Sequence, residues 1–306
     1  MRPSLRVLLA PGVLGVFLAV PALAAPLQRV FVSAVSGSDT NPCSRILPCR
    51  TFGQALTTVA AGGEIVVVDS GGYGPVTITK AVTIVAPVGI YAGISVLSGD
   101  GIDINAGATD VVTLRGLSIN GLGGATGIYP STVGVLHVAN CEISGFSNWG
   151  IIFQLPSQLD VADSVIRESG RAIQATGTGA GTPAVVSIHN CRLENNSSGG
   201  LYTFEYVTAS VSDSTFTGNN YAVVEASGTG TTSSVTLEHC LIANNTYGVL
   251  DSNPGAGIVR VSNSDVTNNG TAFSQFAPHV IESYGNNRTR GNTNPNSGSV
   301  TLVSTN

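Results

Sequence analysis

The sequence has 306 residues, of which 10% are charged and 42% are hydrophobic, and its formal net charge at pH 7 is −5. The apolar content excludes a disordered chain, and the few cations, which form no basic cluster, argue against binding to nucleic acid or to anionic membrane surfaces. The 38 glycines, with abundant Ser, Thr, Asn and Val, favour many short strands joined by turns over a helical bundle.

Residues 1–24 have the features of a secretory signal peptide. Two arginines lie within the first six residues, an apolar stretch follows, and an Ala-Leu-Ala sequence ends at Ala24. The alternative is a membrane anchor, but two prolines and a glycine interrupt an apolar run that is already short for a bilayer span. We therefore expect cleavage after Ala24, secretion to the periplasm or the extracellular space, and no membrane insertion of the mature chain.

Residues 25–50 form an N-terminal extension that lacks the repeat described below. Within it, Cys43 and Cys49 lie in a short loop bounded by prolines. Disulfides persist in exported proteins, and five intervening residues allow a loop of this kind to close. We expect a disulfide between these two cysteines.

A short helix is predicted to begin after this extension. Thr51 and Gln54 fit a capping box, in which the two side chains satisfy backbone groups at a helix start. One face of the segment is apolar, and an amphipathic helix here would cover the open end of the domain that follows. The residues of this face are Phe52, Ala55, Leu56 and Val59.

A repeat dominates the chain downstream of residue 110. It occurs as "VVTLRGLSING", "VLHVANCEISG", "QLDVADSVIRE", "VVSIHNCRLEN", "TASVSDSTFTG", "SVTLEHCLIAN" and "IVRVSNSDVTN". Successive copies are 24, 23, 27, 23, 26 and 24 residues apart, and a period this regular indicates a solenoid. The position that recurs as cysteine, used here as the reference, is occupied by Leu117, Cys141, Ser164, Cys191, Ser214, Cys240 and Ser264.

The other positions of the repeat have consistent chemistry. Those three before and two after the reference are always apolar, so they point inward, and the chain must bend between them. The residue just before the reference is Gly, Asn or Asp in all copies except one, types that tolerate the left-handed conformation of a tight corner. A third strand follows, with inward residues Ile128, Ile151, Ile173, Leu201, Val223, Val249 and Phe273. Strand, one-residue corner and strand form the cross-section of a parallel β-helix.

This pattern predicts the domain organisation. The fold class is all-β, with a right-handed parallel β-helix of about nine coils over residues 51–285 and an N-terminal capping helix. Three strands in a coil of about 24 residues match the right-handed form better than the shorter-coiled left-handed form. Residues 286–306 are polar and lose the period, so we expect them to form a tail that closes the C-terminal end.

Four pairs of asparagines occur one coil apart. Stacked side-chain amides at this spacing can form hydrogen bonds along the solenoid axis. Turn preference alone also accounts for the pairs, and the two interpretations are compatible. The pairs are Asn195-Asn196, Asn219-Asn220, Asn244-Asn245 and Asn268-Asn269.

The cysteines of the reference position occupy alternate coils. Neighbouring coils lie about 4.8 Å apart, so Cys141, Cys191 and Cys240 are separated by about 9.6 Å from one to the next. A disulfide requires Cα atoms within roughly 6.8 Å of each other, and a zinc site requires ligands that converge on one point. We therefore expect three packed, reduced thiols without a metal.

Two stretches carry a family resemblance. The opening "FVSAVSGSDTNPCSRILPCRTFGQALTTVAAGGEIVVVDSGGYGPVTI" resembles the start of many exported pectin-lyase-like proteins, and the later repeat resembles the right-handed parallel β-helix repeat. Together they cover about residues 30–285. The resemblance implies the fold, but that fold hosts lyases, hydrolases, esterases, adhesins and phage tailspikes. The motifs of polygalacturonases and pectate lyases are missing, and the paired aspartates of pectin methylesterases cannot be placed.

One candidate for chemistry is a pair of carboxylates. Glu225 and Asp251 follow Val223 and Val249 by two residues, so they lie on adjacent coils about 5 Å apart. Carboxylates at that distance serve as acid and nucleophile in retaining glycosidases. The alternative is a pair of solvated turn residues at the end of a strand.

Another candidate is the outward row of the third strand, in which Tyr129, Gln174 and Tyr202 recur, with Phe204 and Tyr206 nearby. Such a partly aromatic stripe is suited to stacking on sugar rings, although packing beneath loops is the alternative. Oxygen-bearing side chains also cluster within residues 100–110, as calcium ligands or as turn formers, at Asp100, Asp103, Asn105 and Asp110.

The sequence thus favours an exported β-helix that binds, or acts on, a polysaccharide or a cell-surface glycan without a cofactor or metal. If it is an enzyme, the resemblance implies a polysaccharide lyase or glycoside hydrolase. The alternative is a structural or adhesive surface protein with no catalytic activity. The oligomeric state is not readable from these features.

Overall fold

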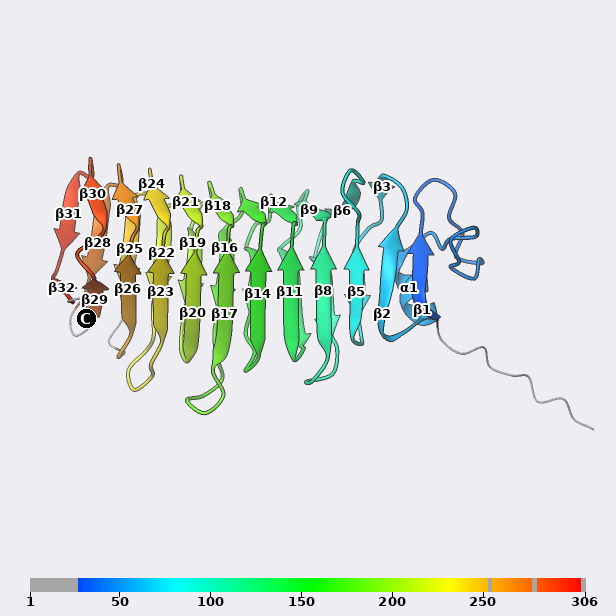
Figure 1. Cartoon of the computed structure of the whole chain (residues 1–306), viewed down its shortest axis with the longest axis horizontal. Coiled ribbons are helices and arrows are strands. Elements are labelled where there is room, and N and C mark those ends of the chain that lie inside the picture. The colour runs from blue at the N-terminus through cyan, green and yellow to red at the C-terminus, as the bar shows by residue number, and fades with distance from the viewer. Residues whose placement is uncertain (1–26, 253–254, 277–279, 304–306) are drawn as a thin grey trace, which may run out of the picture.

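The computed structural model describes residues 27–252, 255–276 and 280–303. The predicted signal peptide lies outside the described residues. Within them the chain forms a right-handed parallel β-helix of about nine coils, which confirms the predicted fold class. Figure 1 shows the coils stacked along one axis, with each coil contributing to three parallel sheets.

Sheet A, on the near side in Figure 1, contains the longest series of strands. In spatial order they are β1 (Leu27–Val32), β2 (Val59–Val67), β5 (Val82–Val85), β8 (Val111–Arg115), β11 (Val135–Ala139), β14 (Gln158–Ala162), β17 (Ala184–His189), β20 (Val207–Ser212), β23 (Ser234–Glu238), β26 (Ile258–Ser262), β29 (Val280–Ser283) and β32 (Val300–Leu302).

Sheets B and C complete each coil. Sheet B contains β3 (Gly71–Gly72), β6 (Ala92–Val96), β9 (Leu117–Gly121), β12 (Glu142–Ser144), β15 (Val165–Arg167), β18 (Arg192–Glu194), β21 (Thr215–Thr217), β24 (Leu241–Ala243), β27 (Asp265–Thr267) and β30 (Arg288–Arg290). Sheet C contains β4 (Val76–Ile78), β7 (Asp100–Asn105), β10 (Thr126–Thr132), β13 (Trp149–Phe153), β16 (Arg171–Ala175), β19 (Gly199–Thr203), β22 (Tyr221–Glu225), β25 (Tyr247–Asp251), β28 (Thr271–Gln275) and β31 (Asn294–Ser297).

One residue makes the corner between sheets A and B in most coils. All seven predicted corner residues have a positive φ, which allows the chain to turn within a single residue. Adjacent strands pair in register, and the three predicted inward rows form one continuous core. The corner residues are Gly116, Asn140, Asp163, Asn190, Asp213, His239 and Asn263.

Asparagine side chains stack at the corner between sheets B and C, as predicted. The Oδ1 atom of Asn219 accepts hydrogen bonds from the backbone nitrogen and from Nδ2 of Asn196, at 2.9 and 3.0 Å. The next steps of the ladder repeat this pattern, and it ends at Asn292, which lies beyond the predicted pairs. In the other three pairs the first asparagine has a positive φ and the second joins the ladder. In the pair Asn219-Asn220 the first asparagine joins the ladder, because the preceding residue, Gly218, has the positive φ.

The cysteines of the reference position are free and buried. The backbone nitrogen of each donates a hydrogen bond to a serine hydroxyl of the next coil, for example from Cys141 to Oγ of Ser164 at 3.1 Å. Burial raises the pKa of each thiol to about 11. A thiol with such a pKa is nearly all protonated at neutral pH, so these cysteines are unreactive in the folded protein.

The helix α1 (Phe52–Thr58) lies at the N-terminal end of the solenoid. Thr51 is its N-cap and accepts a hydrogen bond from the backbone nitrogen of Gln54 at 3.2 Å. The helix packs against β1, β2 and β4 through its buried side chains, so it covers apolar residues that would otherwise face water. The extension before it contributes β1 to sheet A.

The C-terminal end closes in a different way. Residues 288–302 add a further coil made of β30, β31 and β32. Two of its inward positions are polar, since Thr289 pairs with Val266 and Asn296 pairs with Phe273. Polar side chains at inward positions let this coil face water without a covering helix.

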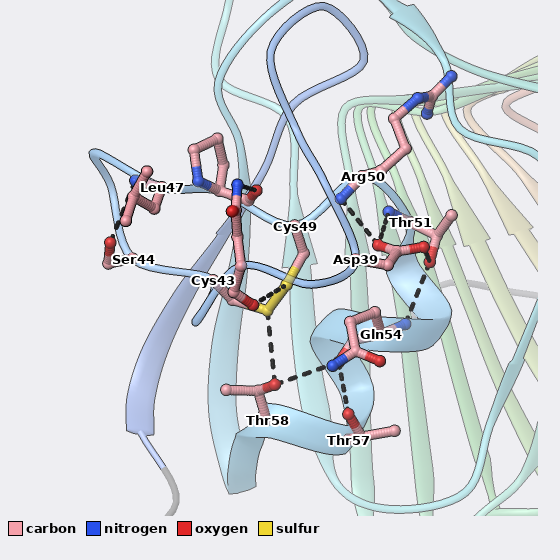
Figure 2. The surroundings of a disulfide bond; sticks show 12 residues. Asp39, Cys43, Ser44, Leu47, Cys49, Arg50, Thr51, Gln54, Thr57 and Thr58 are labelled. Carbon is pink, nitrogen blue, oxygen red and sulfur yellow. Dashed lines mark hydrogen bonds between the residues drawn. A yellow bond between two sulfur atoms is a disulfide. The ribbon is translucent and has the colours of Figure 1, made fainter.

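A disulfide joins Cys43 and Cys49, whose Cα atoms are 4.5 Å apart. Figure 2 shows the bond beside helix α1, where Asp39 accepts hydrogen bonds from the backbone nitrogens of Arg50 and Thr51, both at 2.9 Å. The disulfide and these bonds fix the loop that leads into the helix.

We expect thiol labelling to distinguish the two kinds of cysteine. Alkylation of the unreduced protein after denaturation should modify the three free cysteines and leave Cys43 and Cys49 unmodified, and alkylation of the folded protein should modify none. Mass spectrometry of peptides measures this. Five modified thiols, or a peptide cross-linked through Cys141, Cys191 or Cys240, would contradict the structure.

Candidate functional site

The predicted carboxylate pair lies inside the solenoid. Glu225 and Asp251 are paired across strands β22 and β25, and both side chains are fully buried. They point inward because each follows an inward valine by two residues. Phe153 and Ala175 occupy the same row in earlier coils and belong to the core. The expectation of solvated turn residues is therefore wrong.

The environment favours the neutral form of this pair. Burial, followed by the hydrogen bond and the charge of Glu225, raises the pKa of Asp251 to about 9. Burial also raises the pKa of Glu225, although a hydrogen bond from the backbone nitrogen of Ser227 to Oε1, at 2.9 Å, opposes this. Two buried carboxyl groups in contact share a proton more readily than they both ionise.

Loop residues cover the pair from outside. A Cβ atom at Gly257 would lie 1.8 Å from Oε2 of Glu225, so a larger residue there would force the carboxyl group of Glu225 to move. A Cβ atom at Gly255 would lie 2.3 Å from the backbone oxygen of Ser227. A substrate could reach the carboxyl groups only after these loops moved, and a catalytic role for Glu225 and Asp251 stays a prediction.

The outward row of the third strand has the predicted register. Gln174 pairs with Ile152 and Tyr202, and the row continues through Val224, Leu250 and Ser274. Its exposure varies along the solenoid. Tyr129 is 38% exposed, whereas Tyr202 is only 9% exposed.

Tyr202 is enclosed by its neighbours. The guanidinium carbon of Arg171 lies 4.2 Å from the ring centroid, and the ring of Phe204 stacks at 6.3 Å. Oε1 of Gln174 accepts hydrogen bonds from Arg171 and from Nε1 of Trp149, the latter at 2.9 Å. Both side chains predicted to bind sugar here are thus engaged with protein groups.

A more open aromatic surface lies one and two coils farther along the same face. Tyr221 and Tyr247 occupy one outward row on β22 and β25, and their rings stack with centroids 4.9 Å apart and planes 12° apart. The next residue of the row is Thr271, which is much smaller than tyrosine. The ring of Tyr247 therefore borders a hollow.

This hollow has a volume of about 510 Å³. The two tyrosines, Leu250 and Phe276 provide its apolar side, and Phe276 is 59% exposed. Hydroxyl and amide side chains provide the rest, and none of the described residues that line it is charged. The polar lining residues are Thr271, Ser274, Asn294, Asn296 and Ser297. Aromatic rings beside neutral hydrogen-bonding groups can bind sugars, which have apolar ring faces and hydroxyl edges.

A family model described as "Right handed beta helix region" matches residues 126–294, more than half of the chain. The chain belongs to the right-handed β-helix family. This match covers most of the repeats from which the fold was predicted. No curated protein matches the sequence.

Solved structures resemble this β-helix protein at low sequence identity. A pectate lyase, Pel9A, has a TM-score of 0.68 and 17% identity over 91% of this chain and 78% of its own. XylC in complex with xylose has a TM-score of 0.61 and 9% identity over 86% and 70% of the two chains. A rhamnogalacturonan lyase has a TM-score of 0.51 and 13% identity over 90% and 84%. At these identities the likeness concerns the fold alone.

The remaining candidates of this β-helix protein have local roles. Oδ2 of Asp110 accepts hydrogen bonds from the backbone nitrogens of Gly107 and Ala81, at 2.7 and 3.1 Å, so it stabilises a turn. Asp103 lies on β7 near Asp100, and burial, then the charge of Asp100, raises its pKa. Among the described residues, no group of three His, Cys, Asp or Glu could hold a metal ion.

Proposed function

We propose that this protein is exported and binds an uncharged polysaccharide on the outer face of sheet C, at the hollow beside Tyr247. The stacked pair Tyr221 and Tyr247, bordered by amide and hydroxyl groups, carries the proposal. Export is inferred from the signal-like residues 1–24. Within the described residues, no helix is long and apolar enough to cross a membrane.

The chemistry of the hollow supports a neutral ligand. A charged sugar gains most from a guanidinium or ammonium group, and the described lining of this hollow contains neither. Hydroxyl groups of a sugar instead match side-chain amides, which both donate and accept hydrogen bonds. Strands β25, β28 and β31 each contribute a part of the lining, so a chain of sugars would run along the solenoid axis.

The polysaccharide-acting proteins of similar fold support a carbohydrate ligand as well. Pel9A and the rhamnogalacturonan lyase are named as lyases, and XylC was solved with xylose. We propose binding rather than cleavage for this chain, because Glu225 and Asp251 are buried on the inner side of the same strands. No cofactor enters this proposal.

Replacing Tyr247 by alanine should weaken glycan binding by about 1–2 kcal/mol, the order of one lost aromatic contact, or roughly tenfold in affinity. Affinity electrophoresis in gels that contain xylan, galactan or β-glucan measures the effect. Tyr91→Ala is the matched control, because Tyr91 is also exposed, at 52%, but lies just before β6, near the N-terminal end of the solenoid.

Two results would contradict the proposal. One is that the parent protein binds a polysaccharide and Tyr247→Ala binds it with the same affinity. The other is no retardation of the parent protein by any of these polysaccharides, which would favour a structural or adhesive rod. A melting curve of Tyr247→Ala checks that the variant is folded. We expect a melting temperature close to that of the parent protein, because Tyr247 is only partly buried.

A further inference from the structure

A second groove lies on the outer face of sheet A at the N-terminal end of the solenoid. Its volume is about 850 Å³. The floor is apolar because Phe31, Val66 and Val85 follow one another in a row across β1, β2 and β5. The same row continues to Arg115 on β8, so the apolar floor ends at a guanidinium group.

Two further arginines border the groove. Arg29 projects from β1, and its Nε lies 2.5 Å from Oε2 of Glu64. Arg45 belongs to the loop closed by the disulfide. A wall is formed by residues 86–90, within the connection from β5 to β6, whereas most later coils turn between these sheets with one residue. The groove exists because this early corner is longer.

The charge of the groove differs from that of the whole chain. Three arginines and one glutamate line it, although the net charge of the protein is −5. Arg45 and Arg115 are exposed, and neither makes an ion pair with another residue that the structure describes. By contrast, Arg167, Arg192 and Arg260 each contact an acidic side chain. Two exposed arginines without an ion pair to a described residue therefore lie in this one groove.

We propose that this groove binds an acidic oligosaccharide, at a second carbohydrate site that is independent of the hollow on sheet C. The apolar face of a sugar ring fits the valine floor, and carboxylate groups along the chain fit the guanidinium groups. From β1 to β8 there are three strand spacings, or about 14 Å. Arginines spread over this distance favour a ligand with repeated charges over a single small anion.

Other polyanions fit the groove less well. A single-stranded nucleic acid needs exposed aromatic rings on which its bases stack, and Phe31 is the one aromatic residue in the described lining. Phe31 is itself partly covered. Sugars need no such platform, because an aliphatic surface suffices for their ring faces.

Fluorescence anisotropy with labelled trigalacturonate and its fully methyl-esterified form tests the proposal. Esterification removes the charges and keeps the rings, so the acid should bind at least tenfold more tightly than the ester, and less tightly as NaCl is added. Arg45→Gln and Arg115→Gln should each weaken binding of the acid roughly tenfold, because each loses one charge-assisted contact.

Two controls locate the site. Arg290→Gln removes another exposed arginine, at the opposite end of the solenoid, and should change the affinity less than twofold. Tyr247→Ala should also leave binding of the acid unchanged, so failure here and failure of the function proposed for sheet C are distinguishable. Equal binding of acid and ester, or unchanged affinity in both arginine variants of the groove, would overturn the proposal.

Discussion

Replacing Asn219 by alanine is expected to lower the free energy of unfolding by about 3–5 kcal/mol, the range for breaking a buried hydrogen-bond network. Oδ1 of Asn219 accepts two hydrogen bonds from Asn196, and its Nδ2 donates to the backbone oxygen of Leu193 and to Oδ1 of Asn245. Alanine leaves these buried groups without that partner and creates a cavity. Urea unfolding followed by circular dichroism measures the loss.

The neighbouring asparagine is the matched control. Asn220 is partly exposed and lies outside the ladder, so Asn220→Ala should cost less than about 1 kcal/mol, as is usual for surface substitutions. Equal losses for Asn219→Ala and Asn220→Ala would show that the ladder does not stabilise the solenoid beyond its turn preference.

The second large effect is a fall in stability as the pH rises from about 4 to about 9. In the folded protein the pKa of Asp251 is about 9, against an ordinary value of 3.8. Between these values the folded chain keeps a proton that the unfolded chain has lost. The stabilising contribution is therefore complete below the ordinary pKa and is lost as the pH rises through the folded pKa, by up to about 1.4 kcal/mol per pH unit.

Asp251→Asn should reduce this dependence, because an amide does not ionise, while Glu225, whose pKa is also raised by burial, retains a part of it. We expect the variant to be more stable than the parent protein at pH 8, and its unfolding free energy to vary less between pH 5 and pH 8. Urea unfolding at several pH values measures both. Asp213→Asn, at an exposed corner, should keep the slope of the parent. If the unfolding free energies of the parent and of Asp251→Asn changed equally with pH, this would contradict the account.

The fold could be predicted from the sequence because each coil repeats the same physical requirement. An inward row must be apolar in every coil, and a one-residue corner must accept a positive φ, so both requirements recur at the same position. Even His239 at the corner takes a φ of 51°, although histidine is a less common residue there. The first and last coils lack this repeat, so the sequence does not predict that β1 and β30 to β32 belong to the solenoid.

The candidate site could be predicted only in part. The outward row that contains Tyr202 was identified, but its neighbour, the row of Tyr221 and Tyr247, was missed. Tyrosine recurs at this position in adjacent coils, since Tyr221 pairs with Tyr247. Each tyrosine precedes an inward valine by two residues, so strict alternation would place both rings inside, whereas both are partly exposed and stack on each other. The hollow is also lined by Phe276 and Asn294, which lie outside the aligned repeat segments.

The carboxylate pair shows why exposure is harder to predict than register. Two residues after an inward residue, a strand points inward again, so parity alone places Glu225 and Asp251 in the interior. Their charge suggested a solvated strand end instead. Whether the pair is exposed depends on the loop residues that cover it, such as Gly257 beside Glu225. The repeat pattern contains no information on those loops.

Hydroxyl-radical footprinting of the protein with and without a saturating polysaccharide tests glycan binding on sheet C most directly. This measurement reports the exposure of each aromatic side chain. The account predicts that Tyr247 and Phe276 become protected when a neutral polysaccharide binds, while Tyr91 at the other end stays as reactive as before. Bound polysaccharide that leaves Tyr247 and Phe276 fully reactive would contradict the account.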